Sequence, residues 1–300
     1  MTLGTAQLGL KYGIANKTGK PDLKSANQIL ESAIKNGVNS FDTAPGYGNS
    51  EEIIGSFVKK LSINESFIAT KIPKVQQSKD STLQETYDNI KSVISSSQRR
   101  LNLEQIPICL LHEATDMTDY DGNVTKSLLK LRDEGIVDKI GVSVYHPDEV
   151  RQFLKIDAFD VIQIPINLFD LRLIKQGLLK DLIQRDTIVF ARSIFLQGLF
   201  FLENNKIPPH LHLAKKPLAD LNKLSQDIGK DISTIALTFV RDLAGITSLV
   251  IGTETENQLI EDIKLMDLPP LPSDVSDKIL EIFCEMPEEL INPSLWNKKE

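Results

Sequence analysis

Long apolar runs are missing from this 300-residue chain. None approaches the ~20 residues that a helix needs to cross the hydrocarbon core of a membrane. The first ten residues, MTLGTAQLGL, also lack the basic start and the long apolar stretch of a signal peptide. Basic residues are not in excess either, since 34 Lys and Arg against 41 Asp and Glu give a formal charge of -7. We therefore expect a cytoplasmic globular protein with neither a nucleic-acid nor a membrane partner.

Cysteine is scarce, with only Cys109 and Cys284. Cys109 lies in an apolar, strand-like run and Cys284 in a helical pattern, ILEIFCEM. Both are therefore predicted to be buried core thiols rather than parts of a disulfide framework. Histidine is scarce as well. The pair His210 and His212 stands beside two prolines without nearby carboxylates, so no metal site is predicted.

What the sequence does contain is a rhythm of short apolar strands and amphipathic helices. The strand-like runs are LGTAQLG, NSFDTA, SFIATKI, IPICLLH, KIGVSV, DVIQIP, TIVFARS and ITSLVIG, which begin near residues 3, 39, 66, 106, 139, 160, 187 and 246. Stretches with helical spacing of apolar residues lie between them. The strands are continuously apolar, which is typical of a parallel sheet buried on both faces. Eight such units predict one α/β domain over residues 1–300, a closed (β/α)8 TIM barrel rather than an open sheet.

Two long segments interrupt this rhythm, Glu113–Asn123 after the fourth run and Phe195–Pro217 after the seventh. Loops that follow the strands of a barrel lie at its C-terminal face, where active sites are built. Both segments are therefore predicted walls of a substrate pocket. Residues 268–300 form a tail that is expected to pack near the barrel mouth, where Trp296 either covers the pocket or anchors a surface segment.

Polar and ionisable residues stand at the ends of three successive strand-like runs. Asp42 ends the second run and Tyr47 follows it, Lys71 ends the third, and His112 ends the fourth. Singly, each has an ordinary explanation, such as a turn cap, loop packing, a snorkelling stem or a satisfied core position. Together they would meet at one end of a barrel, and a polar cluster there is typical of a catalytic site.

These four residue types suit a proton transfer. A free tyrosine has a pKa of about 10 and exchanges protons poorly near neutrality. A nearby ammonium stabilises the phenolate and lowers that pKa, and a carboxylate keeps the ammonium charged and oriented. We therefore predict Tyr47 as the general acid, tuned by Lys71, with Asp42 holding Lys71 and His112 orienting a carbonyl oxygen.

The sequence resembles the aldo-keto reductases. The segments that carry the resemblance are LGTAQLGLKYGI, GVNSFDTAPGYGNSEEIIG, TK, LLH, GVS, DVIQIPINL and VIGTETENQLIED, and they span nearly the whole chain in the family order. The resemblance implies a catalytic tetrad of Asp42, Tyr47, Lys71 and His112 and hydride transfer from a nicotinamide cofactor to an aldehyde or ketone. It also implies a cofactor extended across the barrel mouth, and a G-x-G-x-x-G turn is indeed absent from the sequence.

The resemblance also assigns cofactor contacts near the first, fifth and sixth strands. The residues expected at the nicotinamide ribose and carboxamide are Gly4, Thr5, Ser143 and Gln163. Val144 stands where the family usually has Asn. One carboxamide contact is therefore lost, or is replaced by Asn167.

After the seventh strand, Arg192 stands where an aromatic residue of the family commonly stacks on the nicotinamide. A guanidinium is planar and can stack too. It could instead bind a carboxylate or phosphate of the substrate, or form a salt bridge to a neighbouring loop. Ser193 and the turn from Leu196 to Gly198 are expected to contact the pyrophosphate through hydroxyl and backbone donors.

The last strand leads into IGTETENQLIED. The cofactor-binding residues expected in this stretch are Gly252, Thr253, Glu254, Gln258 and Asp262, with Thr253 placed to bind phosphate near a helix N-terminus. Glu254 and Gln258 stand where relatives often carry the basic residues that pair with the 2′-phosphate of NADP. A carboxylate would repel that phosphate and accept hydrogen bonds from a free ribose hydroxyl. The family narrowly favours NADP(H), and NAD(H) is a serious alternative.

The predicted activity is NAD(P)H-dependent reduction of an aldehyde or ketone to an alcohol. Few aromatic residues in the loops, together with Arg192, indicate a small polar or sugar-like substrate. Two alternatives stay open, a redox-neutral sugar-modifying enzyme with a retained nicotinamide and a cofactor-binding regulatory subunit. Retention of all four tetrad residues argues against the subunit. The protein is expected to be a monomer or a small homo-oligomer.

Overall fold

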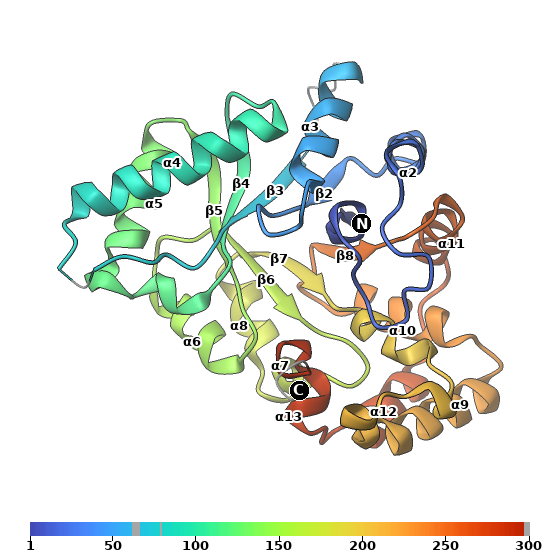
Figure 1. The fold of residues 1–300 in the computed structure, drawn as a ribbon. Coiled ribbons are helices and arrows are strands. Elements are labelled where there is room, and N and C mark those ends of the chain that lie inside the picture. The colour runs from blue at the N-terminus through green and yellow to red at the C-terminus, as the bar shows by residue number, and fades with distance from the viewer. Residues whose placement is uncertain (62–66, 79, 297–300) are drawn as a thin grey trace.

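Eight strands close into a barrel in the computed structural model, which describes residues 1–61, 67–78 and 80–296 (Figure 1). Each strand runs parallel to both neighbours, and β8 closes the ring on β1. The strands are β1 (Thr2–Gly4), β2 (Ser40–Asp42), β3 (Phe67–Ile72), β4 (Ile106–Leu111), β5 (Val137–Ser143), β6 (Val161–Pro165), β7 (Ile188–Arg192) and β8 (Ser248–Gly252). The predicted (β/α)8 barrel is confirmed. Ser66, which opens the third predicted run, lies outside the described residues.

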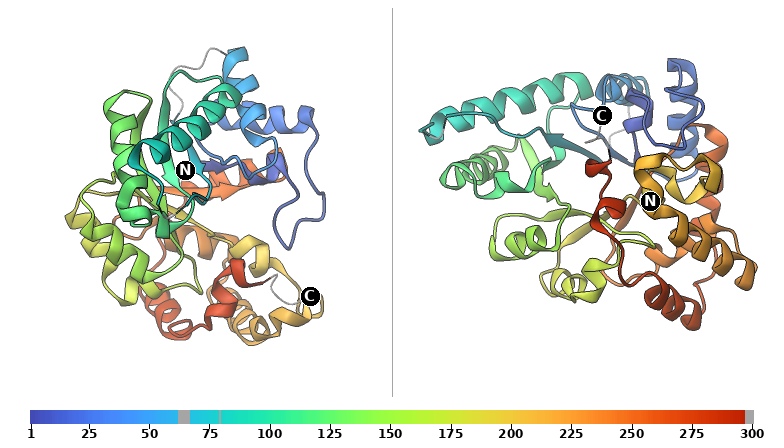
Figure 2. Two further views of the ribbon diagram at one scale, coloured as in Figure 1. Left: turned by 60° about the vertical axis from the view of Figure 1, so that its left-hand side comes forward. Right: turned by 60° about the horizontal axis from the view of Figure 1, so that its bottom comes forward.

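Helices surround the barrel on its outer side (Figures 1 and 2). They are α1 (Ala6–Gly9), α2 (Leu23–Lys35), α3 (Ser50–Leu61), α4 (Leu83–Leu101), α5 (Asn123–Asp133), α6 (Pro147–Lys155), α7 (Arg172–Lys175), α8 (Leu178–Gln184), α9 (Lys215–Ile228), α10 (Ile232–Arg241), α11 (Glu256–Met266), α12 (Ser273–Ile282) and α13 (Glu288–Ile291). Side chains fix several of their starts. Asp22 accepts from the Ser25 amide at α2, and Thr82 forms a capping box with Glu85 at α4. Within the described ranges, no helix combines the length and the apolar character that a membrane crossing requires.

The strands present alternate side chains to two different apolar layers. The smaller layer is a cluster of Ala69, Ile108, Leu110, Val161 and Phe190. The flanking strand residues belong to a larger cluster that also contains the apolar faces of the helices. Since side chains alternate between inside and outside along a barrel strand, the smaller cluster fills the barrel. Two residues further along each of four strands, the inward positions are Lys71, His112, Gln163 and Arg192.

The first predicted strand is shorter than its pattern indicated. Only Thr2–Gly4 is strand, and Ala6–Gly9 forms the short helix α1. Thr5 follows the strand, and both its amide and its hydroxyl donate to the Asp42 carbonyl at the end of β2, at 2.9 and 2.8 Å. The chain then turns onto the loop that follows β2.

The two interrupting segments contain short 3-10 helices rather than open loops. They are η1 (Ala114–Met117) and η2 (Tyr120–Gly122) in the first segment, and η3 (Leu196–Phe201), η4 (Asn204–Lys206) and η5 (Pro209–Ala214) in the second. In η3, Gln197 and Gly198 have positive φ angles of 55° and 87°. This conformation bends the chain sharply where it leaves β7.

The C-terminal tail corrects one prediction and settles the position of Trp296. Cys109 is buried as predicted, but Cys284 is exposed. The reason is that α12 ends at Ile282, and the buried position beyond it is taken by Phe283, whose ring centroid lies 5.0 Å from that of Phe169. Trp296 is buried, and its indole N–H donates to the carbonyls of Glu289 and Leu290 in α13, at 3.1 and 3.3 Å. It anchors the tail, whose packing near the barrel mouth stays a prediction.

Candidate active site

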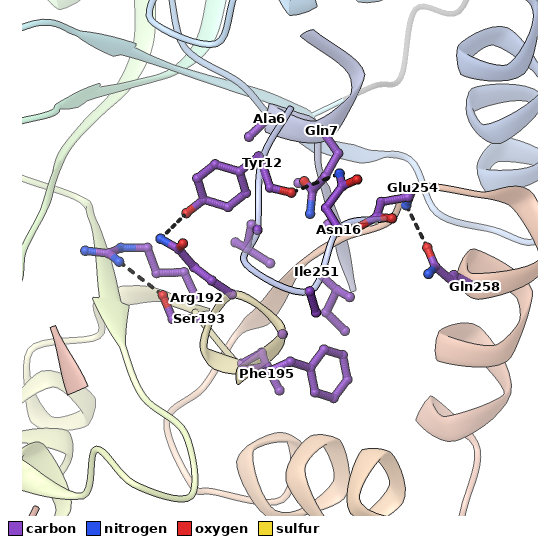
Figure 3. Close-up of a pocket in the computed structure, with 18 of the residues that line it drawn as sticks. Ala6, Gln7, Tyr12, Asn16, Arg192, Ser193, Phe195, Ile251, Glu254 and Gln258 are labelled. Atoms are coloured by element: carbon purple, nitrogen blue, oxygen red, sulfur yellow. Dashed lines mark hydrogen bonds between the residues drawn. The ribbon is translucent and has the colours of Figure 1, made fainter. Parts of the chain in front are cut away.

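A cavity of about 670 Å³ opens at the carboxyl ends of the strands. It is lined from the first strand and the segment after it, from the loops after β2, β4 and β5, from the long segment after β7, and from β8 and α11. Figure 3 shows the part of the lining that comes from β1, β7, β8 and the segments after them. Of the two segments predicted as pocket walls, Phe195–Pro217 lines the cavity with Phe195, Phe201 and Lys206. None of the described residues of Glu113–Asn123 is among the lining residues of this cavity. The prediction that this first segment forms a pocket wall is therefore not borne out here.

The structure brings the four predicted tetrad residues together. The Lys71 Nζ lies 2.7 Å from Asp42 Oδ1, and both side chains are almost fully buried. The same ammonium donates to the Thr43 carbonyl at 3.0 Å and lies 4.8 Å from the centroid of the Tyr47 ring. Asp42, Tyr47 and His112 line the cavity, whereas Lys71 lies behind them. We call this region the tetrad end of the cavity.

Burial and charge oppose each other within this group. Burial alone would lower the pKa of Lys71, but Asp42 and Tyr47 outweigh it and the pKa is raised. Lys71 is therefore a permanent cation. Burial raises the pKa of Tyr47, and Lys71 counteracts this increase most strongly among the nearby charges. The phenol is consequently protonated at neutral pH, as a general acid must be.

His112 is held in its neutral form. Burial, followed by the charge of Lys71, lowers its pKa to about 4. Its ring meets the Tyr47 ring edge-on, with centroids 6.0 Å apart. A neutral imidazole keeps one N–H, so His112 can donate a hydrogen bond to an oxygen in the cavity.

Two close backbone approaches position Tyr47. Gly48 has a φ of +60°, and a Cβ there would lie 2.2 Å from the Gly9 carbonyl oxygen. A Cβ at Gly9 would lie 1.7 Å from the Tyr47 carbonyl oxygen. The start of α3 is tied to the same place, because Ser50 Oγ donates to Thr5 Oγ1 at 2.7 Å and accepts from Thr43 Oγ1 at 3.0 Å. Glycine at both positions therefore permits the contact that aims Tyr47 at the cavity.

Most of the predicted cofactor residues line the cavity. These are Gly4, Thr5, Ser143, Gln163, Arg192, Ser193, Gly198, Gly252, Glu254, Gln258 and Asp262. Leu196 differs, since its side chain lies in the apolar core and its amide donates to Ser193 within the turn. The Gly198 amide is likewise used by the Phe195 carbonyl. Thr253 is buried behind the lining, and its hydroxyl has no hydrogen-bond partner in the described part of the chain.

The predicted carboxamide contacts are modified. The Gln163 amide nitrogen donates to Asp42 Oδ1 at 2.8 Å, so Gln163 also holds the tetrad carboxylate. Asn167 is not among the lining residues: its side-chain oxygen accepts from the amides of Phe169 and Asp170, and its buried Nδ2 has no partner in the described part of the chain. Ser143 lines the cavity with a mostly buried side chain. Ser143 and Gln163 therefore supply the polar groups at this position.

Arg192 is held by the segment after β5 through stacking and a hydrogen bond rather than through a salt bridge. Its guanidinium lies over the Tyr145 ring, with Cζ 4.2 Å from the centroid. Nη2 donates to the Val144 carbonyl at 2.9 Å and Nη1 to Ser193 Oγ at 3.2 Å. Nε is buried and has no hydrogen-bond partner among the described residues. The salt bridge considered from the sequence is not formed there.

Carboxylates gather at the opposite end of the cavity, which we call the acidic end (Glu254, Glu261 and Asp262). Glu254 accepts from Thr18 Oγ1 at 3.0 Å, and Gln258 accepts from the Glu254 amide at 2.8 Å. Burial, with the nearby charge of Glu261, raises the pKa of Asp262 to about 7. Asp262 is therefore only partly ionised near neutral pH.

Sequence reasoning missed the segment after α1, which lines the cavity with Tyr12, Asn16 and Thr18 among others. Gln197 Nε2 donates to the Tyr12 hydroxyl at 3.1 Å, where Figure 3 shows a dashed line at Tyr12. The Ile14 amide donates to the Gln197 carbonyl at 3.0 Å. These two bonds form a bridge between the first and seventh strand ends. Gly13, Asn16 and Gly19 are the turn-forming residues that could have indicated this segment, and both glycines have positive φ angles in the structure.

The comparisons with known proteins agree with this architecture. The model of the aldo/keto reductase family matches residues 1–283. An NADH-specific methylglyoxal reductase of Escherichia coli is 24% identical, over 97% of this chain and 95% of the relative. A D-threo-aldose 1-dehydrogenase of a Pseudomonas species is 24% identical, over 86% and 89%. The solved holo form of an aldo-keto reductase from Bacillus halodurans superposes with a TM-score of 0.77 at 20% identity, covering 94% of this chain and 91% of the other.

Proposed function

The chain belongs to the aldo/keto reductase family, and from this premise we propose that it reduces an aldehyde or ketone to an alcohol with Tyr47 as the general acid. The observation that carries the proposal is the buried Lys71–Asp42 ion pair at 2.7 Å, whose ammonium lies 4.8 Å from the centroid of the Tyr47 ring. A buried pair of this kind stabilises a fold only weakly. Its place directly behind a phenol that faces the cavity favours a catalytic use.

A nicotinamide cofactor fits the polar and backbone groups of the cavity. Gly4 and Gly252 lie side by side on paired strands of the lining, and a Cβ on Gly4 would come within 3.3 Å of the Gly252 nitrogen. A Cβ on Gly252 would lie 2.2 Å from Gln7 Oε1, so glycine leaves room for the polar Gln7 side chain in the cavity lining. Ser143 and Gln163 would hold the carboxamide. When bound, the reduced cofactor would supply the hydride to the carbonyl carbon.

The protein's own groups would handle the oxygen of the substrate. His112, neutral through its low pKa of about 4, donates a hydrogen bond that orients the carbonyl oxygen. The Tyr47 hydroxyl passes its proton to that oxygen. Lys71 stabilises the resulting phenolate, and each unit of pKa that it offsets corresponds to about 1.4 kcal/mol. Asp42 and Gln163 keep Lys71 in place and charged.

Of the two cofactors, NAD(H) suits the acidic end better than NADP(H), against the narrow expectation from the sequence. Glu254 and Glu261 lie in the cavity lining and would repel a 2′-phosphate. A free ribose hydroxyl can instead donate to a carboxylate. The E. coli relative, named NADH-specific, supports the same choice.

The function is tested by Tyr47→Phe, measured as carbonyl-dependent oxidation of NADH and NADPH over a panel of small aldehydes, ketones and sugars. We expect kcat to fall by about 10²- to 10⁴-fold, the usual range for a lost general acid. Tyr87→Phe is the matched control, since it removes a phenol from α4, outside the cavity lining, and should leave turnover as in the wild type. Undiminished turnover in Tyr47→Phe would rule out the assigned general acid.

The bridge between Tyr12 and Gln197 favours a second candidate, the redox-neutral enzyme with a retained nicotinamide. The bridge joins loops on two sides of the cavity, so a bound nicotinamide would exchange only after the bridge opens. The check is to purify the protein without added cofactor and to follow release of any bound nucleotide after dilution. Exchange faster than turnover would eliminate this candidate.

A further inference from the structure

Arg192 is a half-buried cation of the cavity lining that has no carboxylate partner among the described residues, unlike three other cations of this region. Lys71 has Asp42 at 2.7 Å, Arg172 has Asp170 at 2.7 Å, and Lys206 has Glu203 at 2.5 Å. No described carboxylate lies within 4.0 Å of the Arg192 guanidinium, and its buried Nε donates to nothing described. A partly desolvated guanidinium without a counter-charge is unfavourable, and an anion in the cavity would compensate it.

Arg192 is also held in place at the tetrad end. The Tyr145 ring, the Val144 carbonyl and the Ser193 hydroxyl fix the guanidinium from three directions. In Figure 3 it lies on the opposite side of the cavity from Glu254 and Gln258. Its positive charge reaches the reacting groups, because it contributes to lowering the pKa of both Tyr47 and His112. A rigid cation beside the general acid is suited to select a substrate by charge.

We propose that Arg192 binds an anionic group of the carbonyl substrate, a carboxylate or a phosphate, and that the preferred substrates are therefore acidic aldehydes or ketones. This inference rests on the proposed reductase function. Arg192 acts by binding and orienting, while Tyr47 and His112 serve the carbonyl oxygen. The pyrophosphate of the cofactor has the same chemistry as a substrate phosphate, so the test must separate the two anions.

The experiment compares pairs of carbonyls that differ in charge, glyoxylate with methylglyoxal, succinic semialdehyde with butanal, and glyceraldehyde 3-phosphate with glyceraldehyde. We expect the wild type to favour the anionic member of at least one pair in kcat/KM. Arg192→Met should reduce that preference by about 10- to 100-fold, the range for a lost charge-assisted hydrogen bond. Arg192→Lys keeps the charge without the planar fork and should retain part of the preference.

Lys17→Met is the matched control. It removes a cation that lines the same cavity next to Thr18, at the acidic end, so the ratio of anionic to neutral kcat/KM should stay that of the wild type. Thermal unfolding of each variant checks that the barrel is intact, and calorimetric titration with NADH and NADPH gives the cofactor affinity separately. An unchanged ratio in Arg192→Met overturns the proposal. The proposal is also overturned if Arg192→Met binds the cofactor more weakly and loses kcat/KM equally for the anionic and the neutral member of each pair. That result would assign Arg192 to the pyrophosphate of the cofactor.

Binding of unreactive anions separates this inference from the proposed function. Oxamate and inorganic phosphate are titrated into the wild type and into Arg192→Met, each saturated with the better-bound nicotinamide nucleotide. If anion binding depends on Arg192 but no carbonyl is turned over, the anion site is supported and only the proposed reductase function is wrong. If carbonyl turnover depends on Tyr47 but anion binding is the same in the wild type and in Arg192→Met, the proposed anion site is wrong and the reductase function stands.

Discussion

At the tetrad end of the cavity the polar groups are bound to one another before any ligand arrives, whereas at the acidic end they face the cavity with few partners. Lys71, Asp42 and Gln163 form a buried chain of contacts at 2.7 and 2.8 Å. At the other end, Glu254 has one side-chain partner, Thr18, and Asp262 owes its high pKa to burial and to a like charge. The tetrad end is thus preorganised for one reaction, while single substitutions at the acidic end can alter what is bound.

The largest expected effect, and the strongest test of the difference between the two ends, comes from disrupting the ion pair of the tetrad end. Lys71→Met leaves Asp42 buried without a counter-charge, so we expect the free energy of unfolding to fall by about 3–5 kcal/mol. We also expect kcat to fall by about 10²- to 10⁴-fold, since Tyr47 loses the cation that stabilises its phenolate. Urea unfolding and carbonyl reduction measure the two effects.

A second buried ion pair supplies the control for Lys71→Met. Glu51 is buried and accepts from Arg100 Nε and Thr70 Oγ1, both at 2.6 Å, outside the cavity lining. Arg100→Met should also destabilise the protein, by less because Arg100 is part-exposed, but kcat should be retained. Equal losses of kcat in Lys71→Met and Arg100→Met would mean that the tetrad pair serves only the fold.

One group at each end should make the free energy of unfolding depend on pH, in opposite directions. At the tetrad end this group is His112. Its pKa of about 4 lies below the ordinary 6.5, so between these values the unfolded chain binds a proton that the folded protein does not. Stability from this group is present above pH 6.5 and is lost as the pH falls toward 4. Relative to His112→Asn, the wild type should lose about 2–3 kcal/mol between pH 7 and 4. Parallel curves of unfolding free energy against pH for the two proteins would refute the low pKa.

Much of the tetrad end was predictable because it follows from strand periodicity. Residues at alternate positions of parallel strands point into the barrel, so Lys71 and His112 had to face the same space once eight strands were recognised. Gly48, which permits the close contact with Gly9, stands directly after Tyr47 in the same motif. Local sequence therefore indicated both the fold and the four residues.

What could not be predicted depends on contacts between loops that are distant in sequence. The bond between Tyr12 and Gln197 joins segments 185 residues apart, and neither segment has a repeating pattern that reveals the other. The second role of Gln163, as a donor to Asp42, depends on side-chain reach across the barrel. Cys284 was misplaced because helical spacing continued in the sequence past the point where α12 ends.

At the acidic end, Asp262 gives the opposite dependence on pH. Its pKa of about 7 lies above the ordinary 3.8, so the folded protein keeps a proton that the unfolded chain has released. Stability from this group is present below pH 3.8 and is lost as the pH rises through 7. Between pH 4 and 8, we expect the free energy of unfolding of Asp262→Asn to rise by about 2 kcal/mol relative to the wild type. The effect is kept this small because the Asp262 carboxyl is only partly shielded from solvent. Glu261→Gln removes the second cause and should produce a smaller gain of the same sign, and a loss in either variant would contradict the assigned direction.

The smallest expected effect concerns the choice of nucleotide. Glu254→Arg replaces a repelling carboxylate with a guanidinium that pairs with phosphate, so the ratio of NADPH to NADH affinity should rise by about tenfold or more. The control is Glu256→Arg, which makes the same change of charge in the first turn of α11 but outside the main cavity. Any general effect of positive charge on that helix end is therefore present in both variants. Titration of each apoprotein with both nucleotides gives the ratios, and equal shifts in the two variants would mean that Glu254 does not contact the ribose and that nucleotide choice is made elsewhere along the cavity.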